Sequence, residues 1–281
     1  MIIESTPYSL QNRIRILKSK SQTIGFVPTM GALHQGHLSL IETALQKVDK
    51  LIVSIFINPT QFGPNEDYDK YPKNIEQDLL LLQSYPLDVV FTPTATDIYP
   101  FGTKQGVQIV EPYLGQLYCG VTRPHFFQGM LGVVLRLFNI VTPDFAFFGE
   151  KDYQQMTIVK KMVKDLILPI EIIGCPIIRE QNGLAMSSRN QYLSNAEKEE
   201  AKMIYEALCF AKRVFEMEEV QSSVVLERVK HFIEDNSSIQ IDYLAIVHPE
   251  TLEQKSVISQ HDRLLFAGYL GGTRLIDNIA F

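Results

Sequence analysis

The sequence predicts an α/β protein in which a doubly wound parallel sheet, of the Rossmann-like kind, is followed by a smaller α+β domain. Over the first two thirds of the 281 residues, short apolar runs rich in β-branched and aromatic side chains alternate with segments of helical period. After about residue 178 this alternation stops, and charged helical patterns are followed by strand-like runs. Alternating strands and helices are typical of a parallel sheet with helices on both faces.

The apolar runs are the expected strands of the first domain, because strands buried on both faces of a parallel sheet are apolar throughout. They lie at residues 23–27, 51–57, 88–92, 144–148 and 170–173. Helices are expected where apolar side chains recur at helical spacing, at residues 36–48, 74–84, 129–141 and 152–168. In an open sheet of this kind, ligands bind outside the carboxyl ends of the strands.

The second domain is expected to contain two helices and two strands. The helices are expected at residues 195–217 and 224–234, and the strands at residues 239–247 and 263–269. Ser194 is a suitable N-cap for the first of these helices. We therefore expect one domain over residues 1–177 and another over residues 178–281, joined by a polar segment at 179–190.

The composition excludes several classes of protein. With 26 Lys and Arg against 32 Asp and Glu, the net charge is −6 and the pI is about 5.6, which argues against nucleic acid as a partner. No apolar run reaches the roughly 18 residues of a membrane span, and the N-terminus lacks the layout of a signal peptide. Cys119, Cys175 and Cys209 lack the spacing of a metal or redox motif, and we interpret them as buried apolar side chains. These features favour a cytoplasmic protein.

The strongest candidate for chemistry is His34-Gln35-Gly36-His37, where the first apolar run gives way to a helix. Imidazoles three residues apart lie on one face of the first turn, where free N–H groups and the helix dipole favour anions. The alternative, a pair of ordinary surface histidines, is disfavoured by this spacing directly after a strand. The chain has no GxxxxGK[ST] motif, and no GxGxxG after the first strand, so neither a P-loop nor a dehydrogenase-type dinucleotide site is predicted.

Three further polar clusters follow expected strands or lie at the domain junction. They are Asn58 with Gln61, the run from Gly149 through Lys151 to Gln155, and Met-Ser-Ser-Arg at 186–189. Glycine allows a ligand to approach the backbone closely, Lys and Arg suit phosphate, and the amides suit the neutral or carboxylate groups of a small substrate. Each cluster alone is about equally consistent with an ordinary turn or helix start. Their common position at the ends of strands favours a single binding site.

As a set, these motifs closely resemble the pantothenate synthetase (pantoate–β-alanine ligase) family, one of the nucleotidyltransferases marked by His-x-Gly-His. Pro-Thr-Met-Gly-Ala-Leu-His-x-Gly-His begins at Pro28 and Asn-Pro-x-Gln-Phe at Asn58. Phe-Gly-Glu-Lys-Asp-x-Gln-Gln begins at Phe148 and Ser-Ser-Arg-Asn at Ser187. The motifs occur in the order of the family, and the resemblance covers nearly the whole chain.

The resemblance implies an ATP-dependent ligase. Such an enzyme condenses (R)-pantoate with β-alanine to pantothenate through an enzyme-bound pantoyl adenylate, and releases AMP and pyrophosphate. The larger domain would bind nucleotide and pantoate, and the smaller would act as a lid. Mg²⁺ accompanies ATP in the family, and two copies of the chain would form a homodimer through the larger domain. ATP, pantoate, β-alanine and a second copy are thus the expected partners, with no nucleic acid and no membrane among them.

The resemblance also implies a role for each motif. His37 would be the catalytic acid, and His34 and Lys151 would act with it on the phosphates. Gln61 and Gln155 would hold pantoate, and Gln61 would also meet β-alanine. The ATP-binding residues would be Met30, Gly31, Ala32, Leu33, His34, Gln35, Gly36, His37, Gly149, Glu150, Lys151, Asp152, Ile178, Met186, Ser187, Ser188 and Arg189. No metal ligand and no base for the β-alanine amine are assigned.

One segment departs from the family pattern. The family usually reads Arg-Pro-x-His-Phe-x-Gly, whereas this chain reads Arg123-Pro-His125-Phe126-Phe127-Gln-Gly129. The imidazole stands one residue earlier, and Phe126 occupies its usual place. No role is therefore carried over to His125.

Two other functions share part of this pattern. A nucleotidyltransferase that makes a dinucleotide-like product would share the two histidines and the phosphate clamp, but it would not explain Asn-Pro-x-Gln-Phe together with Gln155. A non-catalytic nucleotide sensor would have no need of His34, His37, Lys151 and Arg189 together.

Overall fold

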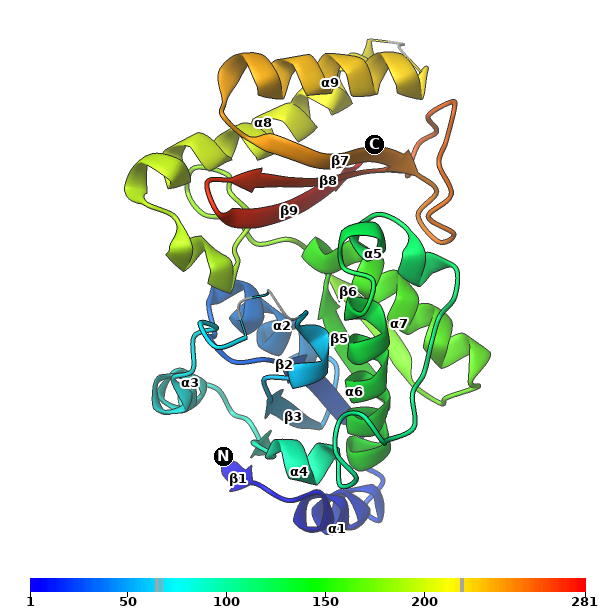
Figure 1. The fold of residues 1–281 in the computed structure, drawn as a ribbon. Helices are drawn as coiled ribbons and strands as arrows, with labels where there is room; N and C mark the ends of the chain where they lie inside the picture. Colours follow the sequence, from blue (N-terminus) through cyan, green and yellow to red (C-terminus); the bar gives the residue numbers. More distant parts are fainter. Residues whose placement is uncertain (64–65, 67, 218–219) are drawn as a thin grey trace. The chain divides into compact units, whose positions relative to one another are not determined.

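The computed structural model describes residues 1–63, 66, 68–217 and 220–281 (Figure 1). The chain forms two compact units. The first comprises Met1–Glu150 and Gln155–Pro176, and the second comprises Lys151–Gln154 and Ile177–Phe281. The short segment Lys151–Gln154 thus clusters with the second unit, although the chain on both sides of it belongs to the first.

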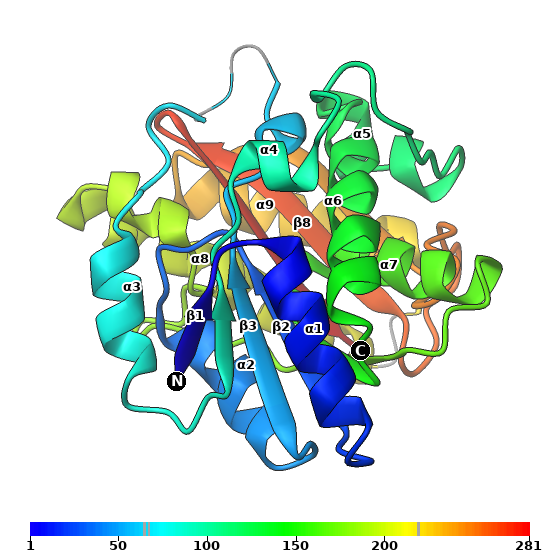
Figure 2. The ribbon, with the colours of Figure 1, turned by 90° about the horizontal axis from the view of Figure 1, so that it is seen from below.

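The first unit is built on a six-stranded parallel sheet, which is seen from two sides in Figures 1 and 2. In order across the sheet, the strands are β1 (Ile2–Glu4), β4 (Val89–Phe91), β3 (Lys50–Ile55), β2 (Ile24–Thr29), β5 (Phe145–Gly149) and β6 (Glu171–Cys175). The chain winds from β2 outward through β3 and β4, then returns to add β5 and β6 on the other side of β2. The predicted doubly wound α/β fold is confirmed, and its topological switch point lies between β2 and β5.

Helices cover both faces of this sheet because the crossovers of parallel strands are right-handed. The connections that run from β2 toward β4 carry α2 (Gln35–Leu45) and α3 (Ile75–Leu82). The connections that run in the opposite direction carry α1 (Pro7–Lys18), α6 (Phe126–Val141) and α7 (Tyr153–Asp165), which lie on the opposite face. Two single-turn helices, α4 (Ala95–Ile98) and α5 (Cys119–Thr122), precede α6.

Both faces of the sheet have a packed apolar core. On one face Phe138 of α6 meets Phe26 of β2 and Phe148 of β5 edge to face, with ring centroids 6.3 and 6.4 Å apart. On the other face Leu38 and Ile41 of α2 are buried in a cluster with side chains of β2, β3 and β4. Each fully buried side chain of this kind stabilises the fold by about 1.5–3 kcal/mol.

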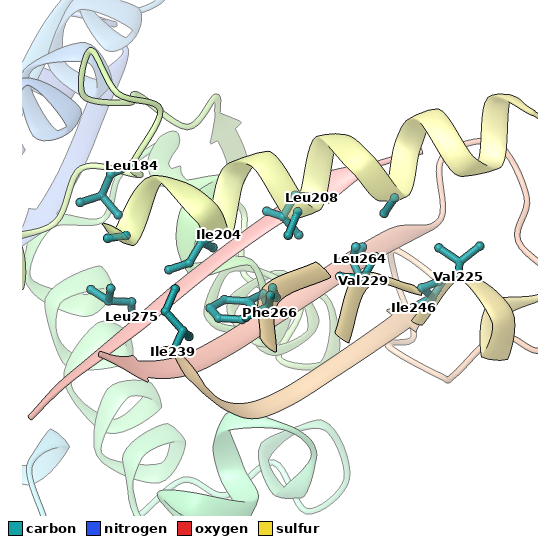
Figure 3. Packing of buried hydrophobic residues seen from close by; sticks show 14 of the residues in the cluster. Leu184, Ile204, Leu208, Val225, Val229, Ile239, Ile246, Leu264, Phe266 and Leu275 are labelled. Carbon is teal, nitrogen blue, oxygen red and sulfur yellow. The ribbon is translucent and has the colours of Figure 1, made fainter. Parts of the chain in front are cut away.

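The second unit is the small α+β domain that the sequence predicts. Its elements are a short 3₁₀ helix η4 (Ser188–Tyr192), α8 (Asn195–Glu216), α9 (Ser222–Asn236), and the antiparallel strands β7 (Gln240–Val247), β8 (Arg263–Leu270) and β9 (Thr273–Ala280). Figure 3 shows Leu208 of α8, Val229 of α9 and Phe266 of β8 among the side chains of its core. Ser194 caps α8 as expected, in a capping box with Glu197.

The sequence does not predict β1, α1 or β9, for physical reasons that differ. β1 has only three residues, and α1 buries just Leu10 and Ile14 among polar neighbours. β9 carries Asp277 and Asn278 at positions that are only 4% and 2% exposed, so two of its buried positions are polar and interrupt the apolar pattern. The carboxylate of Asp277 and the amide of Asn278 both have hydrogen-bond partners within the second unit, which are described below.

The burial of the cysteines and the length and polarity of the helices can be compared with what the composition predicts. Cys119 and Cys175 are buried free thiols, as expected, whereas Cys209 is partly exposed. Burial raises the pKa of the Cys175 thiol, which suits a packed rather than a reactive side chain. In the part of the chain that the structure describes, every helix is too short or too polar to cross a membrane.

Candidate active site

The loop between β2 and α2 contains the first half of the histidine motif and has an unusual backbone. Gly31 and Ala32 both have positive φ, at 81° and 50°. A positive φ is free for glycine but costs about 1 kcal/mol for alanine. The loop therefore needs partners that hold it in this conformation.

Asp78 of α3 is such a partner, and it was not singled out from the sequence. The backbone N–H of Ala32 donates to Asp78 Oδ2 at 2.9 Å, and that of Leu33 donates to Oδ1 at 2.8 Å. Burial raises the pKa of the Asp78 carboxyl, while these two N–H donors oppose the rise. In the sequence, the only signal for Asp78 is an acidic residue on the apolar side of an expected helix. The contact itself joins residues more than forty positions apart, so local pattern does not reveal it.

Replacing Asp78 by Asn is expected to loosen this loop. An amide offers one acceptor oxygen where the carboxylate offers two, so a buried backbone N–H is left without its partner, at a cost of about 1–3 kcal/mol. Hydrogen exchange should show lower protection of the Ala32 and Leu33 amides, and denaturant unfolding should show lower stability. Glu76→Gln, an exposed change on the same helix, is the control. Unchanged protection of both amides would contradict the role given to Asp78.

His34 and His37 are held at the N-terminus of α2 by the backbone. The N–H of Gly36 donates to Nδ1 of His34 at 3.1 Å, and the N–H of His34 donates to Nδ1 of His37 at 3.3 Å. A ring nitrogen that accepts a hydrogen bond carries no proton, so in the neutral rings the proton is on Nε2. The two ring centroids are 4.1 Å apart. The motif thus brings two Nε2–H donors together at a helix N-terminus, where anions are favoured.

The turn after β3 holds Gln61, and Asn58 supports it. Asn58 is fully buried, and its Nδ2 donates to Gln61 Oε1 at 3.0 Å and to the carbonyl of Gly129 at 3.1 Å. Its Oδ1 accepts from the hydroxyl of Tyr99 at 2.7 Å. Both the amide nitrogen and the oxygen of Asn58 thus bond within the protein, and its side chain orients Gln61. With Oε1 already bonded, Nε2 is the end of Gln61 that can meet a substrate oxygen.

Gly129 allows α6 to approach this turn. A Cβ at this position would lie 2.0 Å from the carbonyl oxygen of Thr60, a distance that no side chain tolerates. The glycine of the Arg-Pro-His-Phe-Phe-Gln-Gly segment is thus required by packing, and it lets the Gly129 carbonyl reach Asn58.

The segment that departs from the family pattern lies beside the same turn. Arg123 forms a two-pronged ion pair with Glu66, at 2.7 and 2.6 Å, and its Nη2 donates to the carbonyl of Gln61 at 3.4 Å. The ring of Phe126 lies 3.9 Å from the guanidinium of Arg123, in a cation–π contact. His125 is exposed and does not cap α6. Phe126 therefore fixes Arg123 by stacking.

The end of β5 and the start of α7 contain Gly149, Glu150 and Gln155. A Cβ at Gly149 would have no protein atom within 4 Å, so the space beside this backbone is open. The Glu150 side chain lies near Gly174 of β6. Gln155 is half-buried, and among the described residues its side chain has no hydrogen-bond partner, so its amide remains available to a ligand.

The second unit holds the remaining expected residues on two segments. The N–H of Met186 donates to the carbonyl of Ile178 at 2.9 Å, so these two residues lie side by side at the base of a small hairpin. The chain then enters η4, where the N–H of Arg189 donates to Oγ of Ser187. Lys151 is largely buried and its Nζ lies 3.6 Å from Asp152. The backbone that carries Lys151 is bonded to β9, as described below.

The structure thus sorts the expected site residues into two groups. Within the first unit, residues 30–37 follow β2, Gln61 follows β3, and Gly149 ends β5. Because β3, β2 and β5 are adjacent parallel strands, these residues gather at one edge of the sheet, at the switch point where ligands bind. The second unit contains Lys151, Asp152, Ile178, Met186, Ser187, Ser188 and Arg189.

Comparison with known proteins identifies the family. The family described as pantoate-beta-alanine ligase matches residues 2–280. Pantothenate synthetases from Sulfurihydrogenibium sp. (strain YO3AOP1) and Caldicellulosiruptor saccharolyticus are each 44% identical to this chain, over 100% and 99% of both proteins respectively. The crystal structure of pantothenate synthetase from Thermus thermophilus superposes with a TM-score of 0.93, at 41% identity over 99% of each chain.

A further structure relates the family to its substrates. Pantoate-beta-alanine ligase from Francisella tularensis, solved as a complex with "Beta-gamma ATP" and β-alanine, is 38% identical and has a TM-score of 0.80, covering 100% of this chain and 97% of that one. The similarity extends over both units. This chain therefore belongs to the pantoate-beta-alanine ligase family.

Proposed function

We propose that the residues of the two units act in the ATP-dependent condensation of (R)-pantoate with β-alanine to pantothenate, by way of an enzyme-bound pantoyl adenylate. The condensation is the reaction of the family to which the chain belongs. The observation that best supports the proposed mechanism is the pair of Nε2–H donors held by backbone bonds at the N-terminus of α2. Such donors suit phosphate oxygens that gain negative charge during the reaction.

In the first step, a pantoate carboxylate oxygen attacks the α-phosphorus of ATP. A new O–P bond forms, the bond to the β-phosphate bridging oxygen breaks, and pyrophosphate leaves with the electron pair. Two anions must be brought together, so the positive and donor groups of the site act mainly on the transition state. We assign His37 and His34 to the phosphate oxygens, with His37 as catalytic acid, and we assign Lys151 to the phosphates as a compact positive charge.

The other ATP contacts follow from the same motifs. Residues 30–37 supply backbone and imidazole donors, and the open space beside Gly149 suits the nucleotide. Glu150 and Asp152 flank Lys151 in that motif. In the second unit, Ile178 and the segment of Met186, Ser187, Ser188 and Arg189 would complete the binding of ATP, with two hydroxyls and a guanidinium suited to a triphosphate. This segment would also act as the lid that keeps water from the mixed anhydride.

Gln61 and Gln155 are proposed to hold pantoate. The Gln61 amide is oriented by Asn58 so that Nε2–H is available to an oxygen of the substrate. In the second step the amine of β-alanine, which Gln61 would also contact, attacks the acyl carbon and AMP leaves with the bonding electrons. The amine must lose a proton in this step, and no base is assigned to it.

The proposed metal is Mg²⁺ bound to ATP. Among the described residues no three or more His, Cys, Asp and Glu side chains group in a way that could hold a metal ion. Mg²⁺ keeps several waters and is commonly held through substrate phosphates, so the chain needs no protein cage for it. We further propose a cytoplasmic homodimer that acts without nucleic acid or a membrane.

One assay tests this function against the two alternatives. With ATP, Mg²⁺, pantoate and β-alanine, the protein should form AMP and pantothenate in equal amounts, and AMP should not accumulate if pantoate is left out. A nucleotidyltransferase of the dinucleotide type would release pyrophosphate only when a mononucleotide acceptor is supplied, and would not respond to pantoate and β-alanine. A nucleotide sensor would bind ATP and form no product.

Gly149→Ala is expected to weaken ATP binding without weakening the fold. An added methyl group meets no protein atom within 4 Å and would project into the space assigned to the nucleotide. The Michaelis constant for ATP should rise several-fold while the melting temperature stays unchanged. Gly272→Ala, where a Cβ is equally unobstructed, is the matched control in a turn of the second unit. If both variants bind ATP normally, Gly149 is not at the nucleotide.

Gln155→Ala is expected to weaken the use of pantoate and leave ATP binding intact. A neutral amide bound to a buried substrate group is worth about 0.5–1.5 kcal/mol, or roughly 2- to 12-fold in apparent affinity. Titration of pantoate at saturating ATP measures this effect. An unchanged pantoate affinity and turnover would remove Gln155 from the site, and a parallel loss of ATP affinity would indicate a damaged start of α7 instead.

A further inference from the structure

The segment Lys151–Gln154 is fixed to the second unit by contacts at two of its four residues. Nδ2 of Asn278, on β9, donates to the carbonyl of Lys151 at 3.1 Å. The hydroxyl of Tyr153 donates to the carbonyl of Pro249 at 3.1 Å. Both contacts lie within the second unit, which explains why the segment clusters there.

Arg263 of β8 contacts the side chains that make both of these bonds, the amide of Asn278 and the ring of Tyr153. Its Nη1 donates to Oδ1 of Asn278 at 2.5 Å, and a guanidinium can only donate. The oxygen of the Asn278 amide must therefore face Arg263, which turns the N–H₂ end toward Lys151. The same guanidinium lies 3.9 Å from the ring centroid of Tyr153, in a cation–π contact.

The residue before Asn278 on β9, Asp277, is a buried carboxylate that is paired with Arg179. Asp277 is nearly fully buried, and it accepts two hydrogen bonds from Arg179 at 2.5 and 2.9 Å. Burial raises the pKa of Asp277, and the positive charges of Arg179 and Lys151 oppose that rise. Asn278 thus contacts the carbonyl of Lys151, and the positive charge of Lys151 acts on the pKa of Asp277, the residue that precedes Asn278 on β9.

We propose that Asn278 is a positioning residue for Lys151, and that β9 makes this lysine part of the second unit rather than of the strand-end motif that precedes it. Through Arg179, Asp277 also anchors the hairpin that leads to residues 186–189. The same strand then holds both cationic segments assigned to the triphosphate. The inference rests on the proposed function, in that Lys151 is taken to contact the phosphates.

Asn278→Asp is the test, because it is close to isosteric. The carboxylate still accepts from Arg263, but it cannot donate to the carbonyl of Lys151 and instead repels it. Adenylation, followed as pyrophosphate release from ATP and pantoate, should fall about tenfold or more, since a lost and opposed hydrogen bond is worth at least one such factor. The reaction of preformed pantoyl adenylate with β-alanine should stay within about twofold, because the phosphates that Lys151 contacts have left by then.

Two comparisons separate positioning from a merely structural role. Asn236→Asp is the matched control, because Nδ2 of Asn236 also donates to a backbone carbonyl, that of Phe232, at 2.8 Å on an exposed part of α9, and it should leave both steps unchanged. In a Lys151→Ala background, Asn278→Asp should add less than about threefold to the loss of adenylation, since residues that act through one another are not additive. If Asn278→Asp does not fold, Tyr153→Phe removes the bond to Pro249 and should show the same one-sided loss.

The outcomes separate failure of the role proposed for Asn278 from failure of the phosphate-binding role proposed for Lys151. Normal adenylation by Lys151→Ala would overturn both the role of the lysine and the inference. A slow Lys151→Ala with a normal Asn278→Asp would overturn the inference alone. Equal losses in both steps, or full additivity in the double variant, would assign Asn278 to the stability of β9 and would likewise overturn it.

Discussion

His37→Ala is expected to lower the rate of adenylation by a factor of about 100 to 1,000 while changing stability little. Loss of one donor that acts on charge developing in the transition state costs roughly 2.7–4 kcal/mol. The fold loses less, because the ring is half-buried at a helix end and its acceptance of the backbone N–H of His34 is a cap of a kind worth about 1 kcal/mol. Rapid-quench measurement of pyrophosphate from ATP and pantoate, beside thermal unfolding, gives both quantities.

Two further variants make this result specific. His231→Ala removes an exposed histidine of α9 and should leave adenylation unchanged. His37→Gln retains an N–H donor but cannot transfer a proton at neutral pH, so its activity separates hydrogen bonding from acid catalysis. Activity of the glutamine variant close to that of the native protein would mean that donation is the main role. Near-normal adenylation by His37→Ala would show that the ring does not act on the phosphates.

The parallel sheet could be predicted because its strands are short, apolar and flanked by helices of clear period. β2 to β6 lie within a few residues of the expected runs, and the histidine motif follows β2 as predicted. The carboxyl-end rule for such sheets then brings together Gln61, Gly149 and residues 30–37 without further information. In this part of the chain, local pattern and tertiary structure agree.

The supporting residues could not be predicted, because their partners lie far away in the sequence. In the sequence, Asp78 is one acidic residue among others on a helix, and only the structure shows that it binds the backbone amides of Ala32 and Leu33. Asn58 has the appearance of a substrate ligand, yet its buried amide is used to orient Gln61. β9 lacks the apolar pattern of a strand because two of its buried positions hold polar side chains, Asp277 and Asn278, whose partners are also far away in the sequence.

Lys151→Ala is expected to slow adenylation by a factor of about 100 to 1,000 and to leave the second step nearly unchanged. The ammonium is assigned to ATP phosphates, where a point charge in a water-poor site is worth several kcal/mol in the transition state. Pyrophosphate has departed before β-alanine attacks, so this contribution is absent from the second step. Supplying preformed pantoyl adenylate with β-alanine measures that step alone. Lys160→Ala, an exposed lysine on α7, is the control for loss of charge.

Stability should respond to this substitution in a pH-dependent manner, through Asp277. Burial raises the pKa of Asp277 in the folded protein, and the charge of Lys151 opposes that rise. Lys151→Ala therefore raises this pKa further, which destabilises the fold only where Asp277 is ionised. The loss in unfolding free energy should be present above the raised pKa of Asp277 and should disappear as the pH falls below it, where the carboxyl is protonated with or without the lysine. Urea unfolding of both proteins over a range of pH measures this difference.

The two readouts of Lys151→Ala are independent, and their combination decides what the lysine does. The ion pair between Arg179 and Asp277 is untouched by the substitution, so the variant should stay folded at neutral pH. Loss of adenylation with the second step preserved then assigns the charge to the phosphates. An equal loss in both steps, accompanied by the pH-dependent loss of stability, would instead make Lys151 a counter-ion of Asp277 whose removal disturbs β9. Lys151→Arg distinguishes these cases once more, because it keeps the charge for Asp277 but replaces the compact ammonium with a planar group that does not reproduce its contacts.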